Sequence, residues 1–498
     1  MIENSSEKDG TRKLIGLFAG IALFVTVMAL PTPEGLSVEG KRVGAMVLLM
    51  ACWWIGEAIP IGMTALVPLV MLPVMGVLGA KEASAPYADH NIFLFMGGFF
   101  IAMAMRKWNL HRRIALGIVG AVGFKPRRIV LGFMVATAFL SMWISNTATT
   151  LMMVPIAMAI LSHLDTEKNE TRLSQNMGPA LALGIAYAAN IGGMGTLVGT
   201  PPNIIFAKVA HDVGDGYEIS FVGWMIAAVP YVVVFVPLMW LLLTRVMYKV
   251  PAVGGSGREV IEKERQRLGP MSRGEKMVMA VFCTTAFLWI TRQGIEAGGV
   301  KIPGWAALFP NPKYIKDSTV AIGMSVLMFF IPVGSKGGDR LLDIKWAIKI
   351  PWDVILLLGG GFSLAHAVAA SGLGKWIGGA FEPMSELPTV LVIGLVCLII
   401  SFATEVMSNT ASATLFLPIL GAAAIKAGMP PLMLMIPATL AASCAFILPS
   451  GTPPNAIVFA TGAVSLPQMS RTGFLFDFIA VAVLAVFLPF LILPILGV

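Results

Sequence analysis

The sequence predicts an all-α integral membrane protein, and three features support this: an apolar composition, many long apolar segments and an internal repeat. Of the 498 residues, 57% are hydrophobic and only 12% are charged, whereas an average soluble domain has about 25% charged residues. So few charges could not cover the surface of a water-soluble protein of this length. Lipid is therefore expected to solvate much of the surface.

Apolar segments long enough to cross a bilayer occur along the whole chain. A helix needs roughly 17 to 25 apolar residues to span a hydrocarbon core about 30 Å thick. The candidates, several of them slightly short, are residues 14–30, 43–56, 62–78, 221–243, 277–290, 318–333, 354–370 and 474–496. Apolar stretches between them are interrupted by polar residues, so about ten to twelve crossing or re-entrant elements are expected.

The positive charges lie in short loops, which argues for a membrane topology signal and against nucleic-acid binding. The net charge is +8, and Lys and Arg cluster in loops near 106–113, 125–128, 258–276 and 336–349. Such clusters mark the cytoplasmic side of a membrane protein. The expected organisation is a cytoplasmic tail (1–13), a first transmembrane repeat (14–248), a cytoplasmic linker (249–276) and a second transmembrane repeat (277–498).

Three short motifs occur twice in the same order, which indicates an internal duplication. Ser-Asn-Thr-Ala at 145–148 returns at 408–411, and Gly-Gly-Phe at 97–99 returns at 360–362, both displaced by 263 residues. Gly-Thr-Pro-Pro-Asn occurs at 199–203 and at 451–455. Duplicated halves of transporters are frequently inserted in opposite orientations, although the motifs alone do not fix the orientation.

The Ser-Asn-Thr motifs interrupt apolar stretches at 129–161 and 387–426. Each apolar half is too short to cross comfortably alone, so two half-helices meeting at a polar tip are expected to form a re-entrant hairpin. Ser, Asn and Thr at each tip are also N-cap residues for the half-helix that follows. Non-helical backbone persists at membrane depth only where protein buries it or where it lines a wet cavity. The two tips are therefore expected at a binding site, and Glu405, three residues before Ser408, is a candidate for shaping it.

The Gly-Thr-Pro-Pro-Asn motifs predict two discontinuous transmembrane helices. Glycines permit unwinding, Thr is a favourable N-cap, and Pro is favoured at the first helical position. One helix is expected to end near Gly199 and another to begin at Thr200, with Thr452 in the same position in the second copy. Alternatively, each Ser-Asn-Thr could only satisfy helix–helix hydrogen bonds, and each Gly-Thr-Pro-Pro-Asn could only form a kink.

Four converging helix N-termini would suit a small dianion. Each N-terminus carries the equivalent of roughly +0.5 charge, so four would offer about +2, and helix N-termini bind carboxylates without Lys or Arg. Backbone carbonyls released by unwinding are hard oxygen ligands suited to Na⁺. We therefore expect a dicarboxylate anion and sodium to bind together, and Thr200 and Thr452 to contact the anion.

These repeated motifs, with Trp-Trp-Ile-Gly-Glu-Ala-Ile-Pro at 53–60 and Ala-Phe-Ile-Leu-Pro at 445–449, resemble the divalent anion:sodium symporter family. The resemblance extends from about residue 43 to the end of the chain. It implies eleven transmembrane helices plus two re-entrant hairpins in inverted repeats. It further implies a homodimer in the cell (inner) membrane, with a scaffold domain and a transport domain that moves as an elevator.

The resemblance also assigns residues to a site. The residues implied to bind substrate are Ser145, Asn146, Thr147, Ser408, Asn409 and Thr410. The residues implied for one sodium ion are Ser141, Asn146, Gly199 and Asn203, and those for the other are Thr404, Asn409, Gly451 and Asn455. Ser141 and Thr404 are related by the same 263-residue displacement, which agrees with this assignment.

The expected function is Na⁺-coupled symport of C4 dicarboxylates such as succinate, malate and fumarate, with Na⁺ as the coupling ion and no cofactor. A dicarboxylate antiporter, or a sodium-coupled carrier of sulfate or tricarboxylates, remains an alternative. An anion channel would need a continuous polar path, whereas the polarity here is concentrated at paired breaks. A membrane enzyme would need nucleophiles, metal ligands or acid–base pairs, and the sequence offers none in a recognisable pattern.

Overall fold

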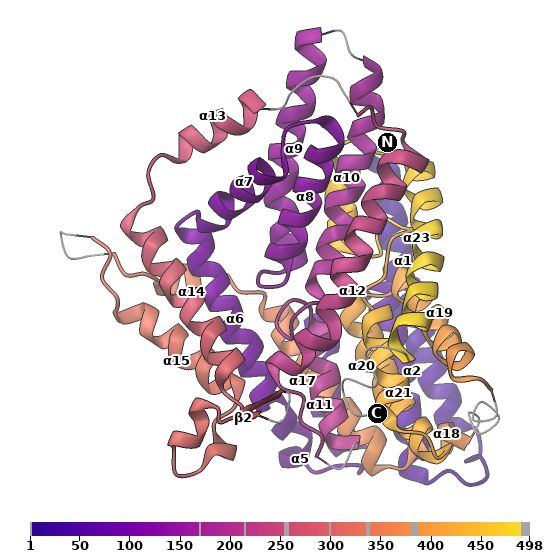
Figure 1. The fold of residues 1–498 in the computed structure, drawn as a ribbon. Coiled ribbons are helices and arrows are strands. Elements are labelled where there is room, and N and C mark those ends of the chain that lie inside the picture. The colour runs from indigo at the N-terminus through magenta and orange to yellow at the C-terminus, as the bar shows by residue number, and fades with distance from the viewer. Residues whose placement is uncertain are drawn as a thin grey trace.

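The computed structural model describes residues 2–168, 171–213, 216–252, 258–297, 300–334, 339–379 and 387–489. They form an almost entirely helical molecule (Figure 1), and the prediction of an all-α membrane fold is confirmed. A small antiparallel hairpin joins β1 (Ile295–Ala297) to β2 (Val300–Ile302). Within the described residues, six helical segments are long and apolar enough to span a membrane: Gly10–Ala29, Ala80–Lys107, Phe221–Met247, Trp352–Ala370, Thr389–Val406 and Leu466–Phe487.

The first half of the chain contains α1 to α12 and two short irregular helices. Their bounds are α1 (Ile2–Ala29), α2 (Val38–Gly56), α3 (Ile61–Thr64), α4 (Val67–Val74), α5 (Ala80–Ser84), η1 (Ala85–Ala88), α6 (His90–Lys107), α7 (Leu110–Val122), α8 (Pro126–Ser141), α9 (Asn146–Lys168), α10 (Thr171–Gly193), α11 (Pro201–Val213), α12 (Phe221–Leu241) and η2 (Leu242–Met247).

The second half contains α13 to α23, again with two short irregular helices. Their bounds are α13 (Arg258–Leu268), α14 (Arg273–Thr291), η3 (Trp305–Leu308), η4 (Pro312–Tyr314), α15 (Asp317–Phe330), α16 (Ile344–Ala347), α17 (Trp352–Ala370), α18 (Leu373–Gly378), α19 (Thr389–Val406), α20 (Asn409–Lys426), α21 (Pro431–Ala441), α22 (Pro453–Ala460) and α23 (Leu466–Phe487).

One expected span is divided in the structure, and helices also occupy two segments expected outside the transmembrane repeats. The expected span 62–78 is divided into α3 and α4, because Pro68 lacks an amide hydrogen and its ring crowds the preceding turn. Helix α1 begins at Ile2, so helix occupies most of the segment expected as a tail. The expected linker 249–276 contains α13 and the first turn of α14.

The repeated Gly-Gly-Phe motifs are points of close helix packing. A β-carbon at Gly97 on α6 would lie 2.6 Å from the side chain of Ala321 on α15, and Ser325 donates a hydrogen bond to Gly97 O at 3.1 Å. A β-carbon at Gly360 on α17 would collide with the Ala65 carbonyl between α3 and α4. Small residues let membrane helices approach this closely. Both copies of the motif therefore serve as points of close contact between helices.

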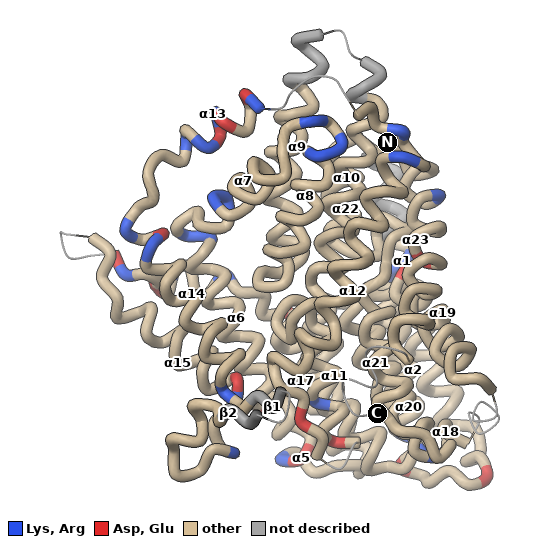
Figure 2. Tube along the Cα trace, in the orientation of Figure 1, with Lys and Arg blue, Asp and Glu red and all other residues tan. Residues whose placement is uncertain are grey.

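Lys and Arg concentrate at one end of the molecule, around α7, α13 and the start of α8 (Figure 2). We call this the basic end. Two ion pairs attach the 249–276 segment to α7 there: Arg112 with Glu264 at 3.1 Å and Arg113 with Glu275 at 2.7 Å. The segment is therefore folded onto the helical body.

The two expected hairpins enter the molecule from opposite ends (Figure 1). The open end of the α8–α9 pair is at the basic end, whereas the open end of the α19–α20 pair is at the other end, beside α18. The repeats also interlock, because α22 packs against α9 and α10, while α11 packs against α20 and α21. This arrangement brings motifs from distant parts of the sequence together.

Candidate functional site

The turn of each hairpin carries its Ser-Asn-Thr motif. Helix α8 ends at Ser141 and α9 begins at Asn146, while α19 ends at Val406 and α20 begins at Asn409. The Ser145 hydroxyl accepts a hydrogen bond from Ala148 N at 3.4 Å. Ser408 caps α20 in the same way, accepting from Ala411 N at 3.2 Å. The prediction that these serines cap the second half-helices is confirmed. The N-terminus of each second half-helix therefore lies at the tip of its hairpin.

A cluster of oxygen atoms lies behind the first tip, and it has too few hydrogen atoms for every acceptor to receive a hydrogen bond. Ser141 Oγ lies 2.6 Å from Asn146 Oδ1 and 2.7 Å from Ala189 O. A hydroxyl has one hydrogen to donate, so it satisfies only one of these two acceptors. Such an excess of oxygen atoms is what a hard cation such as Na⁺ would neutralise.

The second tip repeats this geometry. Thr404 Oγ1 lies 2.8 Å from Asn409 Oδ1 and 2.9 Å from Ala442 O. Thr404, like Ser141, is fully buried. The displacement that relates Ser141 to Thr404 in the sequence therefore corresponds to equivalent contacts in the structure.

The first broken helix is held open by Asn203. Helix α10 ends at Gly193, earlier than the predicted end near Gly199, and α11 begins at Pro201. Asn203 Nδ2 points at three carbonyls of the break: Gly193 O at 3.1 Å, Met194 O at 3.3 Å and Thr196 O at 2.6 Å. These contacts fix the orientation of the amide. Its Oδ1 atom is fully buried and has no hydrogen-bond partner in the part of the chain that the structure describes.

Asn455 has the same role in the second broken helix, between α21 and α22. Its Nδ2 atom bonds to Ala445 O and Leu448 O, each at 3.0 Å. Its Oδ1 atom is again buried, and none of the described residues bonds to it. A buried polar atom left unsatisfied costs free energy comparable to a lost hydrogen bond. Two such atoms at equivalent positions therefore point to a ligand that supplies positive charge to each.

Glycines leave room for the side chains at both sites. A β-carbon at Gly193 would lie 2.6 Å from Asn146 Oδ1, and one at Gly199 would collide with Gly193 O. At Gly451 a β-carbon would lie 2.9 Å from Glu405 Oε2. The breaks therefore require glycine for close approach as well as for unwinding.

The two threonines before the new helices are both buried. Thr452 caps α22, and its Oγ1 atom accepts from Asn455 N at 3.4 Å. Thr200 is 2% exposed, and its carbonyl accepts from Asn203 N at 3.2 Å. Thr147 is half-buried at the first tip and Thr410 is buried at the second.

Asn190 connects the two halves of the site, and the sequence analysis did not identify it. Its Oδ1 atom accepts from Asn146 Nδ2 at 3.5 Å, and its Nδ2 atom contacts Thr452 Oγ1 at 3.2 Å and Ala445 O at 3.3 Å. No Asn occupies the equivalent place in the other half: Ala442 and Pro453 stand at the two repeat displacements, and Ser443 follows Ala442 as Asn190 follows Ala189. The available signal was an isolated Asn in an apolar run, just before Gly192 and Gly193.

Glu405 holds the unwound segment after α21. Its carboxylate accepts from three successive backbone amides: Phe446 N at 2.5 Å, Ile447 N at 2.7 Å and Leu448 N at 2.9 Å. Backbone amides that have no helical partner are thereby satisfied. Glu405 thus shapes the second break.

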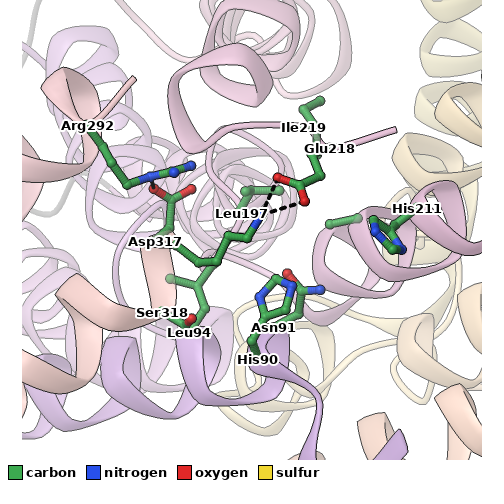
Figure 3. Close-up of a pocket in the computed structure, with 12 residues that line it drawn as sticks. His90, Asn91, Leu94, Leu197, His211, Glu218, Ile219, Arg292, Asp317 and Ser318 are labelled. Carbon is green, nitrogen blue, oxygen red and sulfur yellow. Dashed lines mark hydrogen bonds and ion pairs between the residues drawn. The ribbon is translucent and has the colours of Figure 1, made fainter. Parts of the chain in front are cut away.

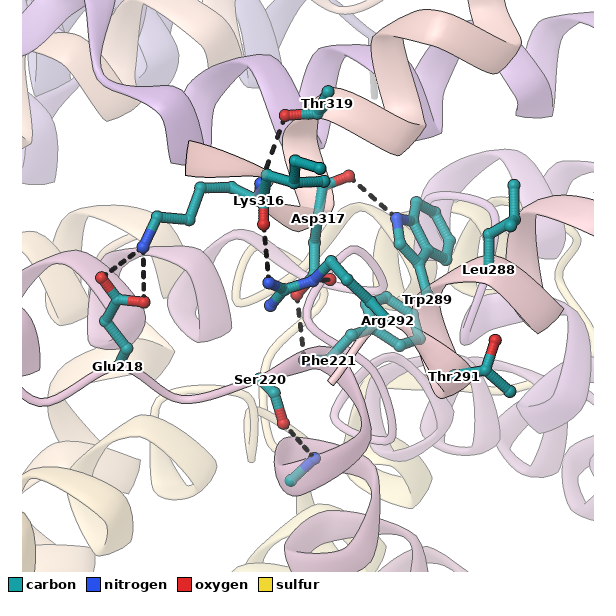
Figure 4. Close-up of polar contacts among 12 residues, drawn as sticks. Glu218, Ser220, Phe221, Leu288, Trp289, Thr291, Arg292, Lys316, Asp317 and Thr319 are labelled. Carbon is teal, nitrogen blue, oxygen red and sulfur yellow. Dashed lines mark hydrogen bonds and ion pairs between the residues drawn. The ribbon is translucent and has the colours of Figure 1, made fainter. Parts of the chain in front are cut away.

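A small cavity of about 40 Å³ lies between α6, α11 and the start of α15, and Leu197 of the first break lines it (Figure 3). Its charged groups are paired with each other. Lys316 Nζ contacts both oxygens of Glu218, at 2.5 and 2.6 Å, and Arg292 Nε contacts Asp317 Oδ1 at 2.5 Å (Figure 4). Burial acts to raise the pKa of Glu218, but hydrogen bonding and charge from Lys316 outweigh it, so this pKa is lowered. None of the repeated site residues lines this cavity.

The arrangement favours alkali-cation chemistry over transition-metal chemistry. Across the parts of the chain that the structure describes, no group of three or more His, Cys, Asp or Glu residues is placed to hold a metal ion. The oxygens at the two tips and breaks come from hydroxyls, amides and the backbone. Such uncharged, hard ligands suit Na⁺.

The chain is similar to known membrane transporters along nearly its whole length. Residues 11–493 match the family model described as the sodium:sulfate symporter transmembrane region. The chain is 42% identical over 502 residues to a sodium-dependent dicarboxylate transporter, SdcS, of Staphylococcus saprophyticus, covering 100% of this chain and 94% of the relative. It is 41% identical to SdcS of Staphylococcus aureus strain USA300, covering 97% and 92%.

Two solved transporters share the fold at low sequence identity. Neisseria gonorrhoeae MtrF aligns with a TM-score of 0.56 and 12% identity, covering 96% of this chain and 94% of its own. The Alcanivorax borkumensis YdaH transporter aligns with a TM-score of 0.55 and 11% identity, covering 84% and 87%. These likenesses concern the fold alone.

Proposed function

This chain belongs to the divalent anion:sodium symporter family, and on that basis we propose that it is a Na⁺-coupled symporter of C4 dicarboxylates such as succinate, malate and fumarate. The observation that carries the proposal is the pair of buried Oδ1 atoms of Asn203 and Asn455, for which the described residues offer no hydrogen-bond partner. Each of these Asn side chains also bonds to the backbone carbonyls that a helix break releases. The names of the SdcS relatives support the same coupling ion and substrate class.

In this proposal, one sodium ion binds at each break. The first site comprises Ser141, Asn146, Gly199 and Asn203, and the second comprises Thr404, Asn409, Gly451 and Asn455. Sodium binding would compensate the excess of oxygen atoms behind each tip. It would also add positive charge beside the helix N-termini at Ser145 and Ser408, where the dicarboxylate is expected.

The two carboxylates of the substrate would be bound by the two tips. The binding residues in this proposal are Ser145, Asn146, Thr147, Ser408, Asn409 and Thr410, with Thr200 and Thr452 beside them. Asn146 and Asn409 serve both anion and cation, so neither ligand binds fully without the other. That shared use is a physical basis for symport, because a carrier that holds only one of the two ligands would retain unsatisfied polar atoms.

We further propose that the site is carried across the membrane by an elevator movement. The site helices α8, α9, α10, α11, α20, α21 and α22 pack on one another, whereas α6, α14 and α15 form a neighbouring group. Lys208 on α11 pairs with Asp89 at the start of α6 at 3.2 Å. Phe221 N at the start of α12 donates to Asp317 on α15 at 3.1 Å (Figure 4). In this proposal the Lys208–Asp89 pair joins the moving group to the fixed group in one state, within a homodimer, and the Phe221–Asp317 contact joins α12 to the fixed group.

The decisive experiment is succinate uptake into proteoliposomes. Uptake should rise steeply with an inward Na⁺ gradient, and K⁺ should not replace Na⁺. Uptake that ignores Na⁺ but requires internal dicarboxylate would instead establish an antiporter. Competition by unlabelled sulfate or citrate, measured in the same vesicles, would separate C4 dicarboxylates from the alternative anions.

A further inference from the structure

An apolar groove of about 400 Å³ lies between α12 and the end of α14, toward the end of the molecule opposite the basic end (Figure 1). Its lining is entirely apolar: Val222, Met225, Ile226, Val229 and Pro230 of α12, and Ile290 of α14. Residues 222–230 extend about 12 Å along a helix, and α12 belongs to a segment that can span a membrane. An open apolar groove on such a helix fits part of a lipid acyl chain.

A second, polar pocket of about 530 Å³ follows the groove along both chain segments. Arg292, which lines the pocket, comes two residues after Ile290 of the groove. Glu218, which also lines it, comes four residues before Val222. The groove and the pocket therefore succeed each other from hydrocarbon depth toward the membrane surface.

The charged side chains of the pocket leave one positive charge in excess. Arg292, Lys313 and Lys316 line it together with a single carboxylate, that of Glu218. Lys316 contacts both oxygens of Glu218, and Arg292 is paired with Asp317 behind it (Figure 4). Lys313 is exposed and makes no ion pair with any residue that the structure describes. This excess matches the single negative charge of a phosphodiester, a group that Lys and Arg bind well.

The loop that carries Lys313 has the character of a membrane interface. Leu308 is 85% exposed and Tyr314 is 79% exposed, although both are large apolar or aromatic residues. Trp305 fastens the loop to α14, because its Nε1 atom donates to Leu288 O at 2.8 Å. Aromatic side chains are enriched where a protein crosses from lipid to water. The pocket beside this loop therefore lies at the depth of the lipid headgroups.

The protein between the groove and the pocket is already held in place. The Phe221 ring stacks on Trp289 with 4.4 Å between ring centroids. Asp317 joins both residues, since its carboxylate accepts from Phe221 N at 3.1 Å and its carbonyl accepts from Trp289 Nε1 at 3.0 Å (Figure 4). The start of α12, the end of α14 and the start of α15 are thereby fixed relative to one another. A preformed site of this kind loses little free energy to ordering when a ligand binds.

We propose that the groove and the pocket together bind one phospholipid with a net charge of −1, such as phosphatidylglycerol. Its phosphate is bound by Lys313 and Lys316, and one acyl chain lies along residues 222–230 of α12. Glu218 can accept hydrogen bonds from hydroxyl groups of the headgroup. A free phosphate or dicarboxylate would occupy the pocket and leave the groove empty, whereas a lipid accounts for both. This lipid site is separate from the repeated motifs and does not depend on which substrate is transported.

The test measures lipid binding to the purified, delipidated protein by native mass spectrometry. The probes are phosphatidylglycerol, phosphatidylcholine and inorganic phosphate. Lys313→Glu reverses the charge that has no partner, and Ile226→Trp fills the groove. Their matched controls are Lys375→Glu on α18 and Val233→Trp, seven residues further along α12 and outside the groove. All four side chains are exposed, so each variant should keep the wild-type size-exclusion profile.

We expect the wild type to bind phosphatidylglycerol about fivefold more tightly than phosphatidylcholine, from the attraction between one Lys and an anionic lipid. Lys313→Glu should weaken phosphatidylglycerol binding about tenfold, because an attraction becomes a repulsion. Ile226→Trp should weaken the binding of both lipids, and the two controls should match the wild type.

Two outcomes would overturn the lipid site. The first is phosphatidylglycerol binding that neither Lys313→Glu nor Ile226→Trp weakens. The second is displacement of the lipid by inorganic phosphate together with full lipid binding in Ile226→Trp, which would show that the pocket takes a free anion. Because no transport is measured, neither outcome bears on the proposed symport.

Discussion

Ser141 Oγ lies 2.6 Å from Asn146 Oδ1, and the same contact joins Thr404 to Asn409 at 2.8 Å in the other half of the chain. In both places the hydroxyl also faces a backbone carbonyl of the neighbouring broken helix, at 2.7 and 2.9 Å. Each tip is thereby tied to its break through a cluster of oxygen atoms. A change at a tip Asn should disturb anion and cation binding together.

Substituting either tip Asn should therefore abolish transport. In Asn146→Ala or Asn409→Ala, Na⁺-dependent succinate uptake should fall at least about tenfold, because an amide that serves both ligands is removed. Expression level and size-exclusion profile should stay at wild-type values. The exposed Asn311 provides an Asn311→Ala control. Normal uptake by both tip variants would refute the site assignment.

The buried Oδ1 atoms of Asn203 and Asn455 predict a selective effect on sodium. Asn455→Ser should raise the Na⁺ concentration for half-maximal uptake about tenfold or more, since an oxygen ligand and two hydrogen bonds are lost. At saturating Na⁺, the apparent affinity for succinate should recover toward the wild-type value. A variant in which succinate affinity is lost at every Na⁺ concentration would show that Asn455 contacts the anion.

The repeated motifs predicted the hairpins and breaks because each gives two signals. The motif occurs twice in the chain, and its residues interrupt a helix. Ser145 and Ser408 therefore lie where expected, as helix caps. Asn190 was missed because it has no repeat partner and its contacts come from α9 and the α21–α22 break, distant in sequence. The division of 62–78 into two helices was missed because the apolar character of the segment was given more weight than the helix-breaking effect of Pro68.

Asn190 should couple the two halves of the site energetically. Its Nδ2 atom contacts Thr452 Oγ1 at 3.2 Å, so Asn190→Ala and Thr452→Val each remove one side of that bond. Residues in direct contact show interaction energies of about 0.5 to 3 kcal/mol. A double-mutant cycle on succinate affinity at fixed Na⁺ should fall in that range. Strictly additive effects would mean that the contact contributes nothing to binding.

The pair Asp89–Lys208 should influence the distribution between transport states. The side chains are 13% and 18% exposed, so the pair is partly shielded from water. Breaking the pair should change the free-energy difference between transport states by about 1 kcal/mol. Asp89→Lys or Lys208→Asp alone should change the maximal uptake rate. The double exchange should restore it, at least in part, although Asp212 also contacts Lys208 at 2.7 Å. If neither single substitution changed the maximal uptake rate, the ion pair would have no role in transport.

The opposed hairpins make a topological prediction that labelling can test. In a background lacking Cys52, Cys283, Cys397 and Cys444, one new cysteine is placed at the open end of each hairpin. Lys125 precedes α8 and is exposed, and Leu387 precedes α19 and is 42% exposed. Leu387 is preferred to Ser385, which lies outside the described residues.

The expected result follows from charge and geometry together. The open end of the first hairpin is at the basic end (Figure 2), which the positive-inside rule assigns to the cytoplasm, and the second hairpin opens at the other end. An impermeant thiol reagent should therefore label Leu387→Cys in intact cells and Lys125→Cys only after permeabilisation. The parent without cysteines gives the background signal, and uptake confirms that each variant is folded. Labelling of both positions from the same side would rule out oppositely inserted hairpins. The elevator proposal would fail with them, because a site between two hairpins that open to one side could not be exposed alternately by moving past a fixed scaffold.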